Sequence, residues 1–487
     1  MPGHRHSHDD LSCLPLRLLI DGDWRDAADN RRITVENPAT GKEIAQVADA
    51  HAADATAALD AACRAQAPWA ALPPRQRADL LHRAYEGLCA DRDRFTRVIS
   101  LETGKPQAEA QAEVDYAAGF LRWFAEEAVR IHGREQQAPG GGSRQIISRW
   151  PVGPCLLITP WNFPLAMITR KVGPALAAGC TMVLKPAEQT PLTAILFCRL
   201  MQEIALPQGV LNLITTTRAD IVVGTLLADK RLRKLSFTGS TRVGRLLLAG
   251  AAASILRTSM ELGGNNPFIV FDDADLDRAV DSAVQAKLRN LGQACTAANR
   301  FLVQDGIAAP FTERLVQRFA ALSADNLGPM IGAAARANTH GLVQDAAARG
   351  ARLVLGGKMP AGHGYYYPPT ILTQVPADAP LLHQEIFGPV APIQIFTTEA
   401  DALAMANDSG YGLAAYACTR DLDRVIRLQG GVETGMLGIN TGILSDPAAP
   451  FGGIKQSGLG REGGTEGIDE YLTTRYTAIA TPATSGT

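Results

Sequence analysis

The spacing of hydrophobic and polar positions changes several times along the chain, and each change predicts a different kind of element. Residues 17 to 47 form short apolar runs separated by turn signals such as Asn37-Pro-Ala-Thr-Gly41, which is typical of short strands. From Ala52 to about Ile131, apolar residues recur at spacings of three and four, with breaks at Pro73-Pro74 and Gly104-Lys-Pro106. This second stretch is therefore predicted to form several helices.

Between Val152 and Phe271, short apolar runs alternate with helical patterns. The runs predicted as strands are 155–158, 181–184, 210–214, 234–237 and 268–271, and the predicted helices lie near 165–178, 191–205, 218–228 and 241–252. Alternation of this length predicts a parallel sheet with right-handed crossovers and helices on both faces. Because ligands in such folds bind at the carboxyl ends of the strands, we look for chemistry there.

A second α/β stretch runs from Ala274 to about Asp446, with helices expected near 275–289, 310–322 and 400–406. The glycine-rich segment 451–464 is expected to be a loop. Two isolated strand candidates, 144–150 and 471–480, flank the sheet regions. Exposed strands of this kind usually pair with something, often another subunit.

Composition narrows the class of protein. A chain of 487 residues is expected to form two or three domains, and its net charge of −2, without a basic run, gives no reason to expect a nucleic-acid or membrane partner. No apolar run approaches the roughly 20 residues of a membrane-spanning helix. The eight cysteines are scattered, without zinc-type spacing, so we expect no metal site and a cytoplasmic location. His4, His6 and His8 could chelate a metal adventitiously, but a disordered tail is the expectation.

Cys295 is the first candidate for chemistry. It lies in the small-residue segment Leu291-Gly-Gln-Ala-Cys-Thr-Ala-Ala-Asn-Arg300, between an amphipathic run and a strand-like run, where another molecule could approach it. An unperturbed thiol has a pKa of about 8.5, so only roughly 3% would be thiolate at neutral pH. A reactive Cys295 therefore needs a base or cationic surroundings; the alternative is a buried core cysteine.

Two strand ends carry candidate cofactor ligands. Gly239 and Ser240 lie in a turn between a strand and a helix, where backbone N–H groups could bind phosphate, although a plain N-cap gives the same pattern. Glu188 could accept from both hydroxyls of a ribose, with Lys185 donating to one of them. A carboxylate there would repel a 2′-phosphate and favour NAD over NADP; the alternative is a solvated loop pair.

Two further segments carry candidate catalytic groups, and the first of them follows another strand end. The amide of Asn162, held between prolines and aromatics in Pro160-Trp-Asn-Phe-Pro164, is a donor suited to an oxyanion, or an ordinary turn residue. Glu261 lies between apolar Met260 and Leu262; apolar surroundings raise the pKa of a carboxyl, which suits a general base. The alternative is an exposed glutamate at a strand end.

Taken together and in this order, Ser240, Glu261, Cys295 and the loop Gln384-Glu-Ile-Phe-Gly-Pro389 resemble the aldehyde dehydrogenase superfamily, over residues 17 to 480. The resemblance implies an α/β fold with a Rossmann-type NAD-binding domain, an α/β catalytic domain and a small β oligomerisation element. The implied ranges are 1–131 with 152–262, 263–465, and 132–151 with 466–487. It also implies a homodimer or homotetramer.

The resemblance implies a role for each matching residue. Cys295 aligns with the nucleophile, Glu261 with the general base and Asn162 with the oxyanion donor, while Lys171 and Glu462 neighbour the base and could relay its proton. The implied cofactor contacts are Trp161, Lys185, Glu188, Gly239, Ser240, Glu385 and Phe387. The product is then a carboxylic acid, reached through a thioester on Cys295, with NAD, or NADP, as hydride acceptor. Because Glu261 is present, hydrolysis is expected rather than transfer to coenzyme A.

The segments Ile168-Thr-Arg-Lys171 and Lys287-Leu-Arg-Asn-Leu-Gly-Gln-Ala-Cys295 are most similar to succinate-semialdehyde dehydrogenases. This similarity implies that Arg170 and Arg289, assisted by Ser445, bind a distal carboxylate of the substrate, and that Phe163 and Phe451 line the tunnel. Pairing of the arginines with protein carboxylates is the alternative. Glutarate semialdehyde, a broad range of aldehydes, or a catalytically silent member of the fold remain the competing interpretations.

Overall fold

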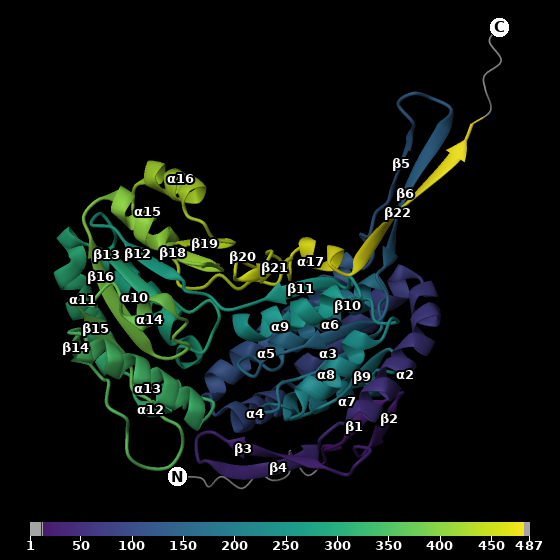
Figure 1. The fold of residues 1–487 in the computed structure, drawn as a ribbon, viewed down its shortest axis with the longest axis horizontal. Coiled ribbons are helices and arrows are strands. Elements are labelled where there is room, and N and C mark those ends of the chain that lie inside the picture. Colours follow the sequence, from purple (N-terminus) through teal and green to yellow (C-terminus); the bar gives the residue numbers. More distant parts are fainter. Residues whose placement is uncertain (1–10, 12, 482–487) are drawn as a thin grey trace.

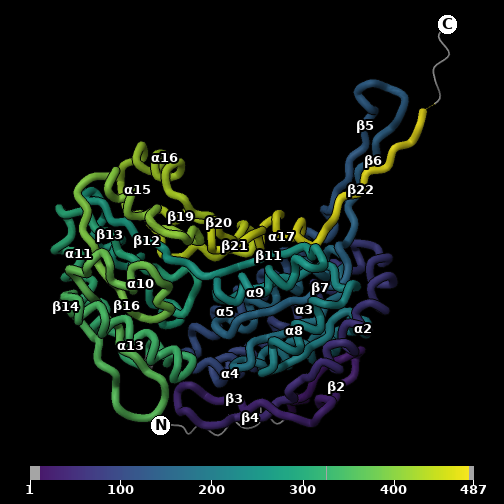
Figure 2. Tube along the Cα trace, viewed as in Figure 1, coloured from purple at the N-terminus to yellow at the C-terminus, as the bar shows by residue number. Residues whose placement is uncertain are grey.

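The computed structural model describes residue 11 and residues 13–481. Two α/β bodies lie side by side, and a three-stranded arm projects from one of them (Figures 1 and 2). His4, His6 and His8, which were expected to lie in a disordered tail, are outside the described residues.

The first body is built on an eight-stranded sheet in the order β2-β1-β9-β8-β7-β10-β11-β21. The strands β9, β8, β7, β10 and β11 are all parallel. The first four were predicted from the alternating pattern, but the predicted strand 268–271 belongs to the second sheet, and β11, which was not predicted, takes its place here. The bounds are β1 (Leu18–Ile20), β2 (Asp23–Arg25), β7 (Cys155–Ile158), β8 (Met182–Lys185), β9 (Leu211–Leu213), β10 (Lys234–Thr238), β11 (Arg257–Glu261) and β21 (Gly458–Leu459). A separate pair, β3 (Arg32–Asn37) and β4 (Lys42–Ala48), forms a hairpin beside it.

Helices cover both faces of this sheet, and strand β7 shows why. Its residues alternate between two cores: Cys155 and Leu157 pack with one set of helices, and Leu156 and Ile158 pack with the other. The first set is α3 (Pro74–Ala90), α4 (Arg92–Thr103), α5 (Gln107–Glu127), α6 (Ala166–Ala178) and α7 (Leu192–Glu203); the second is α2 (Ala52–Ala71), α8 (Ala219–Ala228) and α9 (Thr241–Ala252). A strand that is apolar at every position is thus explained by burial on both sides.

The second body repeats this arrangement on a seven-stranded sheet in the order β14-β15-β16-β13-β12-β18-β19. Phe268 and Val270 of β12 face one core, and Ile269 and the following Phe271 face the other. The strands are β12 (Pro267–Val270), β13 (Arg300–Gln304), β14 (Arg352–Leu355), β15 (Thr370–Thr373), β16 (Val390–Phe396), β18 (Ala414–Cys418) and β19 (Met436–Ile439). The helices are α10 (Leu276–Leu288), α11 (Asp305–Ala320), α12 (Ala324–Leu327), α13 (Ala333–Ala348), α14 (Pro380–His383), α15 (Glu399–Asn407) and α16 (Leu422–Gly431).

The glycine-rich segment 451–464 returns the chain from the second body to the first. It is not a plain loop as expected, because it contains β20 (Ile454–Lys455), which pairs with β17 (Tyr411–Gly412), and β21, which pairs antiparallel with β11. Gly458 lies opposite Glu261 in that pairing, and a Cβ atom at Gly458 would lie 1.8 Å from the carbonyl oxygen of Met260. Glycine here lets the returning segment approach the end of β11. The short helix α17 (Glu466–Asp469) follows.

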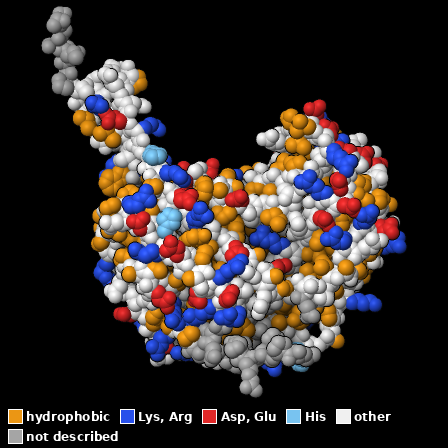
Figure 3. All heavy atoms as spheres, turned by 180° about the vertical axis from the view of Figure 1, so that it is seen from behind, with side chains coloured by type: hydrophobic (Ala, Val, Ile, Leu, Met, Phe, Trp, Pro, Cys, Tyr) orange, Lys and Arg blue, Asp and Glu red, His pale blue; other side chains and the backbone are white. Residues whose placement is uncertain are grey.

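The two isolated strand candidates pair with each other. Strand β6 (Ser143–Pro151) is antiparallel to β22 (Leu472–Ala480) over nine residue pairs, and β5 (Arg134–Gln137) pairs with the other edge of β6. Eight of the nine residues of β22 are exposed. This sheet is the arm that projects in Figure 1, and Figure 3 shows it from behind. On that face of the molecule, acidic and basic side chains are interspersed.

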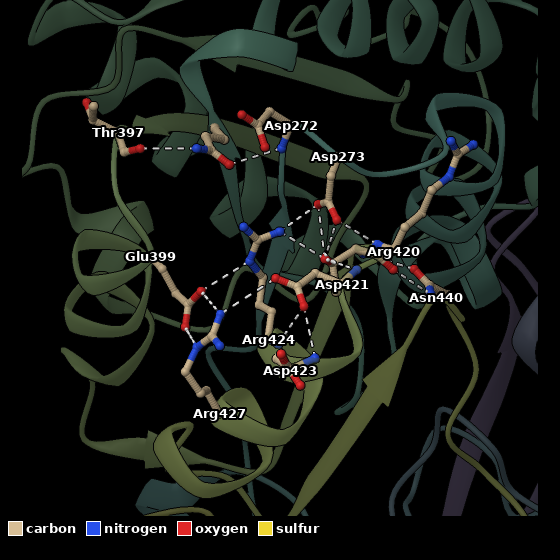
Figure 4. A network of polar contacts seen from close by, with 12 residues as sticks. Asp272, Asp273, Thr397, Glu399, Arg420, Asp421, Asp423, Arg424, Arg427 and Asn440 are labelled. Carbon is tan, nitrogen blue, oxygen red and sulfur yellow. Dashed lines mark hydrogen bonds and ion pairs between the residues drawn. The ribbon is translucent and has the colours of Figure 1, made fainter.

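At the carboxyl ends of β12, β16 and β18 in the second sheet, ion pairs fill the position that ligands take in many α/β folds (Figure 4). The guanidinium of Arg424 donates to Asp273 at 2.7 Å and to Glu399 at 3.1 Å, and it lies 4.3 Å from the centre of the Phe271 ring. Glu399 also accepts from Arg427 at 2.6 Å.

Candidate active site

A cavity of about 270 Å³ lies between the two bodies, and most of the predicted site residues line it. These are Trp161, Asn162, Phe163, Arg170, Gly239, Ser240, Glu261, Arg289, Cys295, Glu385, Phe387, Ser445 and Phe451. Lys171 and Glu462 lie behind the wall, where both are buried, and Lys185 and Glu188 lie at the carboxyl end of β8. The structure therefore brings together residues that are far apart in sequence.

The backbone that leads to Cys295 has an unusual conformation. Asn290, Leu291 and Gly292 have φ values of 50°, 55° and 75°, so three successive residues adopt the left-handed conformation in the short helix η1 (Arg289–Gly292). A Cβ atom at Gly292 would lie 2.4 Å from the carbonyl oxygen of Gly388. Left-handed non-glycine residues are costly and cluster at functional sites, where surrounding contacts hold them.

Two buried side chains hold the carbonyl groups around Cys295. Nδ2 of Asn266 donates to the carbonyl oxygens of Cys295 at 2.7 Å and Ala297 at 2.9 Å, and Nζ of Lys287 donates to that of Ala298 at 2.9 Å. Neither role was predicted from the sequence, because which carbonyl groups these side chains meet is decided only by folding. With these carbonyls fixed, the thiol has a defined position in the cavity.

The thiol of Cys295 is partly exposed to the cavity, and it is not poised as a thiolate in this state. Burial raises its pKa to about 12, and the nearby carboxyls of Glu261 and Glu385 act in the same direction. The guanidinium groups of Arg170 and Arg289 act in the opposite direction. Ionisation of Cys295 therefore depends on these cations and on a proton acceptor nearby.

Asn162 is positioned beside the loop of Cys295. Its side-chain Nδ2 donates to the backbone carbonyl oxygen of Gln293 at 3.0 Å. Its backbone carbonyl oxygen accepts from Nζ of Lys105 at 2.8 Å and from Nδ2 of Asn290 at 2.9 Å. Because a carboxamide nitrogen carries two hydrogens, one remains for a ligand in the cavity. Asn162 can thus act as an oxyanion donor.

Glu261 ends strand β11 with both carboxyl oxygens buried and without a hydrogen-bond partner among the described residues. Burial raises its pKa well above the usual range, and the charge of Glu462 adds to this, while Arg170 and Lys171 oppose it. Burial would also raise the pKa of Glu462, but Lys171 and Arg170 outweigh burial and lower it. The two carboxyls are therefore in opposite states: Glu261 readily holds a proton and Glu462 is ionised.

The two predicted substrate arginines differ. Arg170 is buried, and its Nε lies 2.6 Å from Oε2 of Glu462, so the alternative of a protein carboxylate as partner applies to it. Arg289 is half-buried, donates to Oγ of Ser445 at 3.2 Å and lies 4.8 Å from the centre of the Phe163 ring. Among the described residues, no carboxylate lies within ion-pair distance of Arg289.

The cofactor candidates surround the carboxyl ends of the strands of the first sheet. Ser240 caps α9, with its Oγ accepting from the N–H of Val243 at 3.4 Å, and Nζ of Lys185 lies 3.7 Å from Oε2 of Glu188. The hydroxyls of Thr159 and Thr238, at the ends of β7 and β10, are buried without a partner in the described part of the chain. Such unsatisfied groups fit a polar ligand that lies across the strand ends.

The other end of this region is formed by the loop around Glu385. Oε1 of Glu385 accepts from the N–H of Gly264 at 3.2 Å, and burial raises its pKa to about 7. The ring of Phe387, a residue with a φ of 52°, lies 5.4 Å from that of Trp161, edge to face. These aromatic faces suit a flat heterocycle.

Other residues that line the cavity were not predicted from the sequence. Tyr116 and Met167 come from helices α5 and α6, and Thr238, Leu262 and Thr296 directly neighbour predicted residues. A second cavity of about 400 Å³ lies on the other side of Phe163 and Arg289.

Two kinds of feature are absent from residues 11 and 13–481. There is no group of three or more His, Cys, Asp or Glu side chains that could hold a metal ion. No helix in that part of the chain has the length and apolar character needed to cross a bilayer.

Comparison with known proteins adds three relatives. The profile described as "Aldehyde dehydrogenase family" matches residues 24–477. The chain is 56% identical over 446 residues to a succinate-semialdehyde dehydrogenase of Paenarthrobacter nicotinovorans, covering 90% of this chain and 99% of that protein. It is 47% identical over 470 residues to a glutarate-semialdehyde dehydrogenase of Pseudomonas aeruginosa, covering 95% and 97%. The crystal structure of an Escherichia coli NADP-dependent enzyme superposes with a TM-score of 0.95 at 47% identity, covering 96% and 98%.

Proposed function

The chain belongs to the aldehyde dehydrogenase family, and from this premise we propose that it oxidises a short aldehyde with a distal carboxylate, most directly succinate semialdehyde to succinate. Enzymes of this family oxidise aldehydes with NAD(P). The choice of substrate and the catalytic role of each residue are inferred from the geometry of the site.

The observation that carries the proposal is Arg289. Its guanidinium lines the cavity of Cys295, has no carboxylate partner among the described residues, and is oriented by Ser445. The carboxyl of Glu109 lies near enough to interact with the charge of Arg289 but forms no ion pair with it, so an anionic ligand in the cavity would supply the direct partner that the guanidinium lacks. Charge-assisted hydrogen bonds contribute roughly 1.5–3 kcal/mol each, so an anionic group on the substrate gains most from this position. Glutarate semialdehyde, which is one methylene longer, is the second candidate.

The reaction begins at the sulfur. We assign Cys295 as nucleophile: its thiol gives its proton to the ionised carboxylate of Glu261, which passes it on before the hydrolytic step, and the thiolate attacks the aldehyde carbon to give a thiohemiacetal. The free N–H of Asn162 and the backbone N–H of Cys295 would hold the oxyanion. Arg170 and Arg289 favour the thiolate, since both lower the pKa of Cys295.

The residues around the strand ends fit a nicotinamide dinucleotide. The unsatisfied hydroxyls of Thr159 and Thr238 and the N-terminus of α9 at Ser240 are suited to the polar parts, and Glu188 with Lys185 to a ribose. Glu385, Trp161 and Phe387 would border the nicotinamide end. When bound, the dinucleotide supplies the acceptor for the hydride that the substrate carbon loses, and this leaves a thioester on Cys295.

Glu261 then serves as the base that takes a proton from water, whose oxygen attacks the thioester carbon and releases the acid and the thiol of Cys295. A carboxyl with a raised pKa is a stronger base than an ordinary one. Lys171 and Glu462 form an ion pair behind it and could pass the proton inward. Both would then act through Glu261 rather than on the substrate.

The test compares kcat/KM for succinate semialdehyde, glutarate semialdehyde and propanal, with NAD and with NADP, in the parent and in Arg289→Met. We expect the parent to prefer a semialdehyde, and Arg289→Met to lose about 10- to 100-fold for it with little change for propanal. Arg352→Met, which removes an exposed arginine on β14, is the matched control.

Two other outcomes of this experiment would favour the competing interpretations of the protein's function. If propanal is the better substrate and Arg289→Met leaves the semialdehyde rate unchanged, the protein is a broad aldehyde dehydrogenase. If NAD binds but no aldehyde yields NADH, it is a catalytically silent member of the family.

We further propose that two copies associate through the arm of β5, β6 and β22, as a homodimer or as part of a tetramer. The arm exposes apolar side chains, including Trp150 at 44%, Tyr476 at 55% and Ile479 at 47% of their surface. Exposed apolar surface on a thin sheet favours a partner. Light scattering of Tyr476→Asp/Ile479→Asp, which should dissociate the assembly, tests this.

The domain ranges implied by the resemblance also stay proposals: NAD-binding over 1–131 and 152–262, catalytic over 263–465, and oligomerisation over 132–151 and 466–487. Limited proteolysis, followed by NAD binding to the fragments, tests them. The cytoplasm is the proposed location, because none of the eight cysteines, all of them in the described part of the chain, is joined in a disulfide. Fractionation of the source cells tests it.

A further inference from the structure

The phenol of Tyr116 is a polar group of the cavity that the mechanism above does not use. We propose that Tyr116 is a specificity-determining residue, whose hydroxyl donates a hydrogen bond to the distal anionic group of the substrate beside Arg289 and Ser445. The inference rests on the proposed function and deepens it.

The position of the phenol is fixed by its helix. Tyr116 lies on α5, and its ring meets that of Phe120 one turn further on, edge to face, at 4.9 Å and 66°. A ring held in this way has its hydroxyl at a defined point of the cavity wall rather than in several rotamers. Tyr116 itself lines the cavity of Cys295.

The hydroxyl is buried and forms no well-aligned hydrogen bond among the described residues, although the side chains of Ser445 and Arg170 lie close enough to lower its pKa against the effect of burial. Buried hydroxyls are rarely left unsatisfied, because the lost interaction with water is not replaced. An unsatisfied hydroxyl in a cavity wall therefore points to an acceptor on a bound molecule.

The surroundings select an anionic acceptor. The guanidinium carbon of Arg289 lies 5.9 Å from the centre of the Tyr116 ring, and Arg289 in turn contacts Ser445. Burial raises the pKa of Tyr116, so the phenol keeps its proton and acts as a donor at neutral pH. Arg289, Ser445 and Tyr116 together offer a cation and two hydroxyls, which match the several lone pairs of a carboxylate.

Tyr116 also compensates for Arg170. Because Arg170 is already paired with Glu462, it has less capacity to bind a second carboxylate, so the anion needs donors other than a second free arginine. A neutral phenol provides one without adding charge near the thiol. It would thereby tighten binding of carboxylate-bearing aldehydes without a benefit for uncharged ones.

The experiment removes one oxygen atom, in Tyr116→Phe, and measures kcat and KM for succinate semialdehyde and propanal, together with inhibition by succinate. We expect KM for the semialdehyde and the inhibition constant for succinate each to rise about tenfold, with the propanal parameters unchanged. Tyr367→Phe, which removes a phenol hydroxyl from the second body, is the control. Equal melting temperatures and propanal rates show that the variants are folded.

The outcomes separate this inference from the proposed function. If the parent does not prefer succinate semialdehyde over propanal, the proposed function fails. If the parent has that preference and Tyr116→Phe keeps it, with unchanged succinate inhibition, the inference about Tyr116 is wrong while the proposed function stands. A rise in KM for both aldehydes would also overturn the inference, because it would show a general effect on the cavity.

Discussion

Nε of Arg170 lies 2.6 Å from Oε2 of Glu462, so the cation that most lowers the pKa of the base is paired from within the protein. Glu462 arrives there through the glycine-rich return, where its backbone pairs with that of Phe451 in two hydrogen bonds of 2.7 and 2.8 Å. The guanidinium of Arg170 also lies 4.2 Å from the centre of the Phe451 ring. Arg170 therefore stabilises the protein around the site, whereas Arg289 is available to bind a ligand.

This division predicts different effects for two matched substitutions. Arg170→Met should lower the free energy of unfolding by roughly 3 to 5 kcal/mol, because it leaves Glu462 buried with one cation fewer. Arg289→Met should change it by about 1 kcal/mol or less in either direction, because no ion pair is lost. The ratio of kcat/KM for succinate semialdehyde to that for propanal should fall more in Arg289→Met. Urea unfolding and steady-state kinetics measure both; the reverse order would contradict the division.

The pH dependence of turnover should respond to Lys171. Glu261 accepts a proton only when ionised, so the rate falls as the pH drops through the pKa of its carboxyl. Lys171 lowers that pKa, and Lys171→Met should therefore raise it and move the acid limb of kcat to higher pH. Ser236→Ala removes the 2.9 Å hydrogen bond from Nζ of Lys171 but leaves the charge, and should move the limb much less. An acid limb that stays in place in Lys171→Met would show that another group sets it.

The parallel sheet of the first body was predictable, because buried strands and amphipathic helices have different hydrophobic periods. Strand β11 was not, because Arg257-Thr-Ser-Met-Glu261 has two exposed or half-buried positions and only one apolar residue. Helix α13 was also missed: it is rich in alanine and buries only four residues, so its apolar period is weak. The strands β6 and β22 were predicted from the sequence. Their pairing with each other was not, because pairing depends on their register in space.

The site was predictable where a residue type and its motif indicate the chemistry, as for Cys295, Glu261 and Asn162. The pairing of Arg170 with Glu462 was not, because the two are brought together only by the return of the glycine-rich segment to β11. Tyr116 and Asn266 have no local signal at all. Their significance depends on which carbonyl group or cavity their side chains meet after folding.

Replacement of Cys295 tests the chemical core of the proposal. Cys295→Ser should lower kcat by roughly three orders of magnitude or more, because an alcohol is a far weaker nucleophile than a thiol at neutral pH. NAD binding, measured by calorimetry, should be retained. Cys89→Ser, which changes an exposed cysteine, is the control and should leave kcat unchanged. Parent-like turnover by Cys295→Ser would refute the mechanism.

The preference between the two dinucleotides should depend on Glu188. Its carboxylate is 43% exposed and lies 3.7 Å from Nζ of Lys185 at the end of β8. A 2′-phosphate would meet this negative charge, so NAD is the expected cofactor, and Glu188→Ser should raise kcat/KM for NADP by about tenfold. Lys185 stays available to the phosphate in that variant. If the parent uses NADP as well as NAD, the argument from Glu188 is wrong.

The ion pairs around Arg424 should stabilise the second body in a pH-dependent way (Figure 4). Hydrogen bonds from Arg427 lower the pKa of Glu399, and Arg424 adds to this effect; burial alone would raise the pKa of Asp273, but bonds from Arg420, Thr419 and Arg424 outweigh it. A carboxyl whose pKa is lower in the folded than in the unfolded state adds stability above its unfolded pKa of about 4. That stability is lost as the pH falls through the folded-state pKa.

Arg424→Met should therefore lower the free energy of unfolding by roughly 1 to 3 kcal/mol at pH 7, since the arginine is 17% exposed and contacts two carboxylates. The difference from the parent should shrink below about pH 4, where the parent itself protonates Asp273 and Glu399. Arg420→Met, which removes a 68% exposed partner of Asp275, should change stability by about 0.5 kcal/mol or less. Urea unfolding at several pH values measures all three proteins. A destabilisation by Arg424→Met that stays constant down to pH 3 would assign the effect to packing against Phe271 instead of to charge.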